Sequence, residues 1–223
     1  MFGKGKGGEA SPVCKEECEF TGYRSLIAEV FFLNESIGEM RAELLQLLRE
    51  KSYEEREVTL ASGRPSNFYI DGKQTALHPR GAYLIGHLFA ERLGAFGEVE
   101  AVGGPTLGAD PLGTATSLVT QLQGRGLPAF IVRKEPKGHG TQRWIEGAKN
   151  LRPGAGVVML EDVVTTGGSS LRAVDNVESE GYRVLGILTL VDREEGGRET
   201  IEGRGLHFEA LFGKAEIRAE AGG

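Results

Sequence analysis

The chain has 223 residues, 39% of them hydrophobic, and carries 26 Lys and Arg against 32 Asp and Glu, a formal net charge of −6. This much apolar material excludes a wholly disordered or fibrous protein, and the length suits one compact domain with at most a small appendage. The acidic balance argues against a nucleic-acid-binding domain, whose binding surface is usually basic.

Cysteine use and hydropathy set the expected compartment. Cys14 and Cys18 are the only cysteines, and a lone C-x3-C pair lacks the further ligands of a zinc site. The sequence has no apolar run near the roughly 18 residues of a membrane span, and no signal-peptide core. We therefore expect a protein of a reducing compartment, located in the cytoplasm, with neither a membrane nor a nucleic acid as its partner.

Residues 1–36 are expected to form an N-terminal extension. The segment is rich in Gly, Lys and Glu and has no sustained period of 2 or 3.6 residues, so we expect it to be mobile or loosely docked. A helical apolar face begins at residue 37, and the compact domain is predicted to span 37–223. The apolar residues of this first helix are Ile37, Met40, Leu44, Leu47 and Leu48.

Strand and helix patterns then alternate along the chain. Two short strands are predicted at 58–61 and 68–71, around a turn-rich stretch, and a helix at 80–93 follows Pro79. The later elements are a strand at 99–102, a helix at 110–123, a strand at 129–132, a polar loop at 133–143, a strand at 157–160, a helix ending near 180 and a strand at 184–191. Apolar strands separated by amphipathic helices predict an α/β fold with a central, mainly parallel sheet, and ligands bind beyond the carboxyl ends of such strands.

The most informative segment is VVMLEDVVTTGGS, which begins at Val157. An apolar strand delivers two adjacent carboxylates, Glu161 and Asp162, to the carboxyl edge of the sheet. A Thr- and Gly-rich turn then enters a helix, and the backbone N–H groups of such a turn form a cradle for a phosphate. A plain strand–turn–helix is the alternative, but two acids before T-T-G-G-S-S are hard to explain by packing.

A second segment, RKEPKGHGT, begins at Arg133 and collects cations in an acidic protein. A Gly-flanked basic loop can close over an anionic leaving group and exclude water from it. A solvated turn is the alternative for this segment taken alone.

The 157–169 segment resembles the signature for phosphoribosyl pyrophosphate (PRPP) in type I phosphoribosyltransferases. The resemblance implies that fold, with a small hood subdomain from 37–75 plus a C-terminal segment. It also implies that the turn holds the ribose 5-phosphate, that the two acids face the ribose hydroxyls, and that Mg²⁺ is held mainly by substrate, without dedicated protein ligands. The residues implied to bind PRPP are Arg133, Lys134, Lys137, His139, Glu161, Asp162, Val163, Val164, Thr165, Thr166, Gly167, Gly168 and Ser169; Glu161, Asp162, Lys137 and His139 are implied to be catalytic.

Further segments narrow the choice of nucleobase. The basic loop, together with LVDREEGG at 190–197, is similar to orotate phosphoribosyltransferases, in which the Arg matching Arg193 contacts orotate. An Arg suits a planar carboxylate because its fork binds in a bidentate way, and Thr165 is also implied to contact orotate. The segment TLASGRPSNFYID at 59–71 is similar to the part of the hood that covers the base. Weaker site assignments are Ser62, Gly63, Tyr69, Lys73, Pro105 and Thr106.

The chain departs from the family pattern in two places. Ala61 stands where many members have Lys, and the 103–110 segment, GGPTLGAD, lacks the Lys that some members carry in their pyrophosphate loop. Lys73 is the residue expected to supply part of the missing charge.

The resemblance implies the reaction orotate + PRPP ⇌ orotidine 5′-monophosphate + pyrophosphate, a step of pyrimidine (UMP) biosynthesis. It further implies a homodimer with a shared active site, in which Lys134 acts in the neighbouring subunit, and a chain without a fused decarboxylase domain. Two alternatives stay open: a phosphoribosyltransferase for another nucleobase, and a PRPP-sensing regulator with the same fold that binds nucleic acid. The Arg193 segment disfavours the first, and the net charge of −6 disfavours the second.

Overall fold

The computed structural model describes residues 35–59, 65–136 and 143–219. It divides the chain into two units, Met1–Ser36 and Ile37–Gly223. The expected extension thus lies, except for its last two residues, outside the described residues. Among the described residues, no helix is long and apolar enough to cross a membrane.

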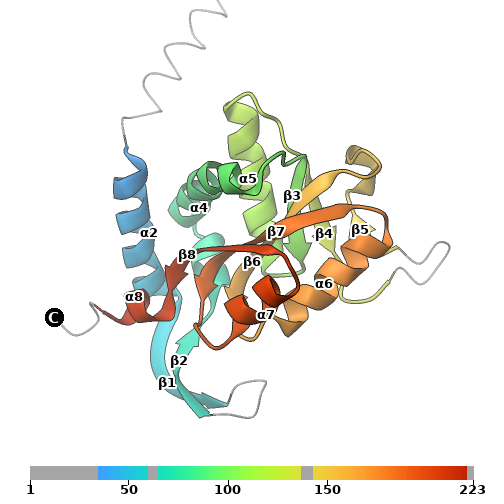
Figure 1. Cartoon of the computed structure of the whole chain (residues 1–223). Coiled ribbons are helices and arrows are strands. Elements are labelled where there is room, and N and C mark those ends of the chain that lie inside the picture. The colour runs from blue at the N-terminus through green and yellow to red at the C-terminus, as the bar shows by residue number, and fades with distance from the viewer. Residues whose placement is uncertain (1–34, 60–64, 137–142, 220–223) are drawn as a thin grey trace, which may run out of the picture. The chain divides into compact units, whose positions relative to one another are not determined.

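A six-stranded sheet forms the centre of the second unit (Figure 1). Its strands follow the order β5 (Ile145–Glu146), β4 (Ala129–Val132), β3 (Ala101–Pro105), β6 (Gly156–Val164), β7 (Arg183–Asp192) and β8 (His207–Gly213). All neighbours are parallel except the edge strand β5, which is antiparallel to β4. The predicted α/β class and the mainly parallel sheet are confirmed.

Helices cover both faces of this sheet, and the alternation of strand residues explains how. Val158 and Leu160 of β6 belong to one buried cluster, with the residues of α2 (Ile37–Lys51), α4 (Pro79–Arg92) and α5 (Ala109–Leu122). Val157 and Met159, which point to the opposite face, belong to a second cluster with α6 (Gly168–Ser179) and α7 (Gly197–Gly203). Both faces of the strand are buried, which is why its sequence is continuously apolar.

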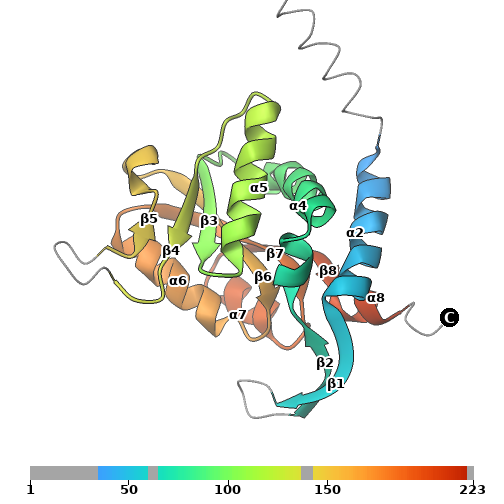
Figure 2. The same cartoon turned by 180° about the vertical axis from the view of Figure 1, so that it is seen from behind.

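A two-stranded hairpin extends below this layered core (Figure 2). It consists of β1 (Tyr53–Thr59) and β2 (Pro65–Ile70), which pair in antiparallel fashion. Two arginines join α2 to the C-terminal helix α8 (Lys214–Arg218). Arg41 Nη1 forms an ion pair with Glu216 Oε1 at 2.6 Å, and Arg49 Nη2 donates to the Glu216 carbonyl at 2.8 Å. The first helix and the last helix of the unit are thereby held together.

Several predicted boundaries were wrong. The first hairpin strand begins at Tyr53 rather than Val58, because its sequence YEEREVT is charged on both faces and gives no apolar alternation. The strand predicted at 99–102 lies at 101–105, and the one predicted to end at Leu160 continues to Val164. The elements without a prediction are mostly short or polar, and β8 (HFEALFG) is the apolar exception. They are α3 (Gly72–Ala76), the 3-10 turns Leu93–Phe96 and Ala148–Asn150, β5, α7, β8 and α8.

Candidate active site

The two acids of the signature segment lie within β6, not after it. Pairing of β6 with β7 continues to Val164 opposite Asp192, so the strand carries Glu161 and Asp162 toward its carboxyl end. Because successive side chains alternate, the acids face opposite sides of the sheet. They therefore lie in two different environments, although they are neighbours in sequence.

Glu161 is the more deeply buried of the two acids. It is 6% exposed, and its Oε1 accepts a hydrogen bond of 2.6 Å from the hydroxyl of Ser170, on the first turn of α6. Burial raises the pKa of Glu161 to about 8, and neighbouring Asp162 contributes in the same direction. This shift favours the protonated form of Glu161.

Asp162 lies beside a cation. Its Oδ2 is 3.6 Å from Lys73 Nζ, which also lies 2.6 Å from Asp71 Oδ1. Burial raises the pKa of Asp162, and Lys73 opposes this shift. The pKa of Lys73 is raised in turn, first by its hydrogen bond to Asp71. Gly108 packs closely against the Asp162 carboxylate, because a Cβ at position 108 would lie 2.3 Å from Asp162 Oδ1.

The turn after β6 has the geometry of an anion cradle. Gly167 adopts φ +78°, and α6 begins at Gly168 with no side chain capping its first N–H groups. A Cβ at Gly167 would lie 3.1 Å from the Gly197 carbonyl oxygen, so the turn packs closely on α7. Uncapped N–H groups at the positive end of a 12-residue helix suit a phosphate.

The loop after β3 is held by polar contacts. The Thr106 amide donates to the Val132 carbonyl at 3.0 Å, and its hydroxyl donates to Asp110 Oδ2 at 2.8 Å. Asp110 Oδ1 is buried and has no hydrogen-bond partner among the described residues. Pro105 and Thr106 thus end β3 at the same sheet edge as the two acids.

Arg193 links this edge to the hairpin. Its backbone N–H donates to the Val164 carbonyl at 2.9 Å, and its Nη2 donates to the Phe68 carbonyl at 3.0 Å and to Ser66 Oγ at 3.2 Å. Glu195 Oε1 lies 3.3 Å from the same nitrogen. The side chain of Arg193 is only 9% exposed, so its guanidinium is enclosed in the described structure.

The basic loop is anchored at both ends. The Arg133 amide donates to the Trp144 carbonyl at 2.8 Å, and Arg133 Nη1 lies 2.8 Å from Glu146 Oε1. Glu180, at the end of α6, accepts hydrogen bonds from the amides of Trp144 and Ile145. Lys134 is exposed. Lys137 and His139 lie outside the described residues.

The chain is similar in sequence and fold to known proteins. The phosphoribosyl transferase domain family matches residues 73–203. Orotate phosphoribosyltransferases of Nostoc sp. and Sorangium cellulosum are 49% and 51% identical over 176 and 171 residues, which is 79% and 77% of this chain and 84% and 89% of theirs. This chain belongs to the orotate phosphoribosyltransferase family.

Solved structures of the family agree with this assignment. The Mycobacterium tuberculosis orotate phosphoribosyltransferase in complex with Fe(III) dicitrate has a TM-score of 0.69 at 44% identity, covering 80% of this chain and 99% of that one. The same enzyme in complex with PRPP has a TM-score of 0.66 at 41% identity, covering 80% and 98%. The predicted type I phosphoribosyltransferase fold is confirmed.

The fold brings most of the predicted site residues to one edge of the sheet. Glu161, Asp162 and the 163–169 turn lie at the end of β6, Arg193 follows the adjoining β7, and Lys73 pairs with Asp162. Tyr69 lies on β2, where the guanidinium carbon of Arg56 is 3.8 Å from its ring centroid. Ser62 and Gly63 lie outside the described residues.

Four contacting residues were missed by the sequence analysis. Ser170 follows the signature by one position and binds Glu161, and Ser66 lies within the hood segment and binds Arg193. Glu195 follows Arg193 by two positions. Glu180 is 36 residues from its partner Trp144, and no local pattern signals that contact.

Proposed function

We propose that the chain transfers the phosphoribosyl group of PRPP to orotate, releasing pyrophosphate and forming orotidine 5′-monophosphate. The observation that carries the proposal is the carboxyl end of β6, where two acids precede an uncapped helix N-terminus and Arg193 adjoins them. We propose that the acids face the ribose, the helix N-terminus holds the 5-phosphate and Arg193 binds the anionic base.

Charge placement supports a reaction through a cation-like ribose. Asp162 and Glu161 are proposed to face the ribose, where positive charge develops in the transition state. The described cations of the basic loop, Arg133 and Lys134, follow β4, which lies on the far side of β3 from β7. Stabilising opposite charges as they separate favours the transition state over bound substrate. Lys137 and His139 are the loop residues proposed to meet the pyrophosphate.

Lys73 is proposed to replace the cation that the 103–110 loop lacks. It already lies against Asp162, and Gly108 of that loop packs against the same carboxylate. Its side chain is 39% exposed, so the ammonium can turn from Asp71 toward a bound pyrophosphate. The backbone N–H groups of the loop add to this charge.

Magnesium is proposed to enter with PRPP rather than to reside in the protein. No group of three or more His, Cys, Asp or Glu side chains among the described residues is arranged to hold a metal ion. Mg²⁺ commonly uses one or two carboxylates together with substrate phosphates, and Asp162, with 16% of its side chain exposed, fits that use. When bound, the ion neutralises charge on the pyrophosphate.

We also propose that the protein is a cytoplasmic homodimer in which Lys134 acts in the partner's site. Lys134 is exposed at the start of the basic loop, away from contacts that would hold it in its own subunit's core. Mixing a Lys134→Ala subunit with an Asp162→Asn subunit should restore part of the activity that each variant lacks. Absence of complementation, with a monomeric mass in solution, would contradict the shared site.

The reaction itself is tested by PRPP-dependent loss of orotate absorbance. Uracil and purine bases are assayed in parallel, and orotidine 5′-monophosphate with pyrophosphate is assayed for the reverse reaction. We expect PRPP-dependent turnover with orotate and none with uracil or the purine bases. Turnover of another base in place of orotate would reassign the substrate, and absence of any PRPP-dependent turnover would overturn the proposal.

A further inference from the structure

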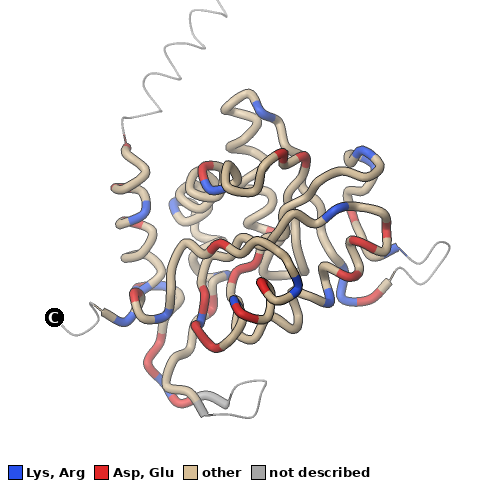
Figure 3. Tube along the Cα trace, viewed as in Figure 1, with Lys and Arg blue, Asp and Glu red and all other residues tan. Residues whose placement is uncertain are grey.

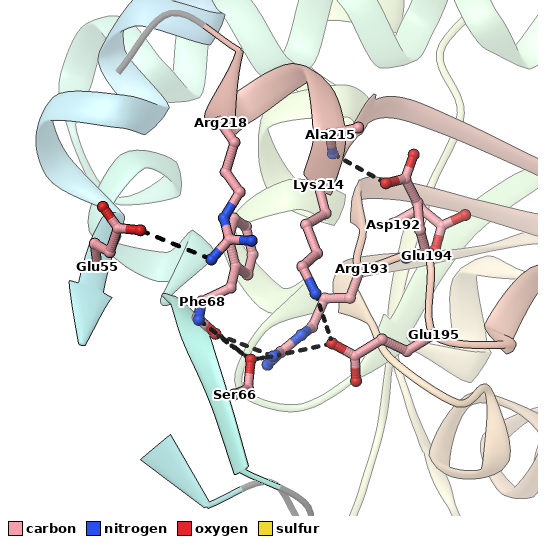
Figure 4. A network of polar contacts seen from close by, with 10 residues as sticks. All are labelled: Glu55, Ser66, Phe68, Asp192, Arg193, Glu194, Glu195, Lys214, Ala215 and Arg218. Carbon is pink, nitrogen blue, oxygen red and sulfur yellow. Dashed lines mark hydrogen bonds and ion pairs between the residues drawn. The ribbon is translucent and has the colours of Figure 1, made fainter. Parts of the chain in front are cut away.

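A network of polar contacts surrounds Arg193 and connects three parts of the chain (Figure 4). Glu195 Oε1 lies 3.3 Å from Arg193 Nη2 and also 3.3 Å from Lys214 Nζ, on α8. The side chain of Glu195 is 13% exposed and that of Lys214 is 24% exposed. One carboxylate oxygen is thus shared by two cations in a largely enclosed place.

The same guanidinium has an unused donor. Arg193 Nε is buried and has no hydrogen-bond partner among the described residues. Nε and Nη2 lie on one edge of the guanidinium, and that edge binds a carboxylate through two parallel hydrogen bonds. In the described structure Nη2 donates to the Phe68 carbonyl and to Ser66 Oγ and lies 3.3 Å from Glu195 Oε1, whereas no carboxylate reaches Nε. A carboxylate from a ligand would complete this edge, and would compete with Glu195 for Nη2.

The local charge suits one further carboxylate. Arg193 and Lys214 bring two positive charges and Glu195 one negative charge, so these three contacting side chains leave one positive charge in excess. The guanidinium carbon of Arg193 and Lys214 Nζ each lie 5.6 Å from the ring centroid of Phe68, which is fully buried. Both cations therefore border the same hairpin residue, beside which the base is expected to bind.

We propose that Glu195 pairs with Arg193 when no base is bound, and that the carboxylate of the base displaces Glu195 from Arg193 when the base binds. Glu195 then keeps its contact with Lys214 while the base takes the Nε and Nη2 edge. In the empty enzyme Glu195 compensates a buried guanidinium that would otherwise lack a counter-charge. When the product leaves, Glu195 returns to Arg193. This inference rests on the proposed function, because it needs a base that carries a carboxylate.

Exchange predicts opposite effects for two substitutions. Glu195→Gln removes the competing charge, so the KM for orotate should fall on the order of tenfold, and the inhibition constant of orotidine 5′-monophosphate should fall in proportion. Lys214→Met removes the cation that receives Glu195, so the orotate KM should rise. The KM for PRPP and the inhibition constant of uracil, which has the same ring without the carboxylate, should stay the same in both variants.

A matched control is Glu55→Gln. Glu55 is a 71% exposed carboxylate of the same network, 3.9 Å from Arg218, and its removal should leave the orotate KM unchanged. A higher orotate KM in Glu195→Gln would overturn the proposal and make Glu195 a support for Arg193. Equal changes in the orotate and PRPP KM values would also overturn it. If the unmodified protein turns over no orotate, the proposed function fails instead, so the two failures are distinguishable.

Discussion

The cradle at the end of β6 and the network around Arg193 serve the same proposed substrates with different physical means. The cradle consists of backbone: Gly167 at φ +78° and the uncapped start of α6, close to each other in sequence. The network consists of residues from the hairpin, the segment after β7 and α8. Its Arg193–Ser66 hydrogen bond joins two residues that are 127 positions apart in the sequence. A backbone site has one geometry, whereas an ion-pair site can exchange partners.

This difference matches the chemistry expected at each end of the substrate. The 5-phosphate keeps its bonds throughout the reaction, so a fixed cradle costs little reorganisation. The base must enter and leave, and a network that closes on itself through Glu195 remains compensated when the site is empty. Acidic and basic residues are interspersed along the described part of the trace (Figure 3).

The largest expected effect comes from breaking the cradle. Gly167→Val forces a branched side chain into φ +78° and against the Gly197 carbonyl and Ile201, so PRPP affinity should fall on the order of 100-fold and unfolding stability by roughly 1–3 kcal/mol. Thermal melting with and without PRPP measures both quantities.

Gly168→Ala separates binding from folding. A Cβ there would meet only Arg172 Nη1, at 3.8 Å, so stability should hold while PRPP affinity falls. Gly94→Ala is the control, because Gly94, like Gly168, has no positive φ and a Cβ there would meet nothing within 4 Å. If Gly168→Ala binds PRPP like the unmodified protein, the phosphate is held elsewhere.

The next effect concerns Glu161. Its pKa is raised to about 8 in the folded protein from an ordinary value of 4.5, so the folded state holds a proton that the unfolded state has lost between these pH values. Stability should therefore fall as pH rises from about 4.5 to 8, by on the order of a few kcal/mol. Glu161→Gln should flatten this dependence, raise stability above pH 8 and lower kcat.

Melting temperatures across pH 5–9 test this prediction. A pH dependence that is the same in the variant and the unmodified protein would show that Glu161 does not titrate as its burial requires. A variant with full kcat would remove Glu161 from the reaction, leaving the buried Ser170 contact as its role.

A smaller effect is expected from the anchor of the basic loop. Glu180→Ala leaves the amides of Trp144 and Ile145 without their acceptor, which should cost about 1–2 kcal/mol of stability and lower kcat several-fold while the orotate KM is kept. Glu178→Ala is the matched control, since Glu178 pairs only at the surface with Arg204. Unchanged kcat in Glu180→Ala would show that the loop does not depend on this anchor.

The smallest effect is expected from removing the extension. Residues 1–34 carry none of the predicted site residues, so a chain that begins at Glu35 should keep its kcat, its KM values and its oligomeric state in solution. A start at Met40 is less suitable, because Met40 is 6% exposed inside α2, which begins at Ile37. A change of oligomeric state or a large fall in melting temperature on truncation would make the extension an integral element.

The elements that could be predicted from the amino-acid sequence are those whose pattern is local. In one short segment the apolar strand β6 carries two acids and is followed by the Gly-rich turn that begins α6. This local pattern predicted the order of these parts and the edge of the sheet at which they lie. The helical patterns at 80–93 and 110–123 likewise predicted α4 and α5 to within one residue at each end. The charged strand β1 and the late elements α7, β8 and α8 carried too little periodicity to be predicted.

The environment of each polar residue depends on how distant segments pack together. Glu161 and Asp162 are adjacent and chemically alike, yet one is buried beside Ser170 and the other pairs with Lys73, because strand residues alternate between faces that different helices cover. Arg193 likewise reads as a surface residue after a strand, and becomes enclosed only because the hairpin and α8 meet over it. Burial and long-range pairing are sums over distant segments, and no local pattern encodes them.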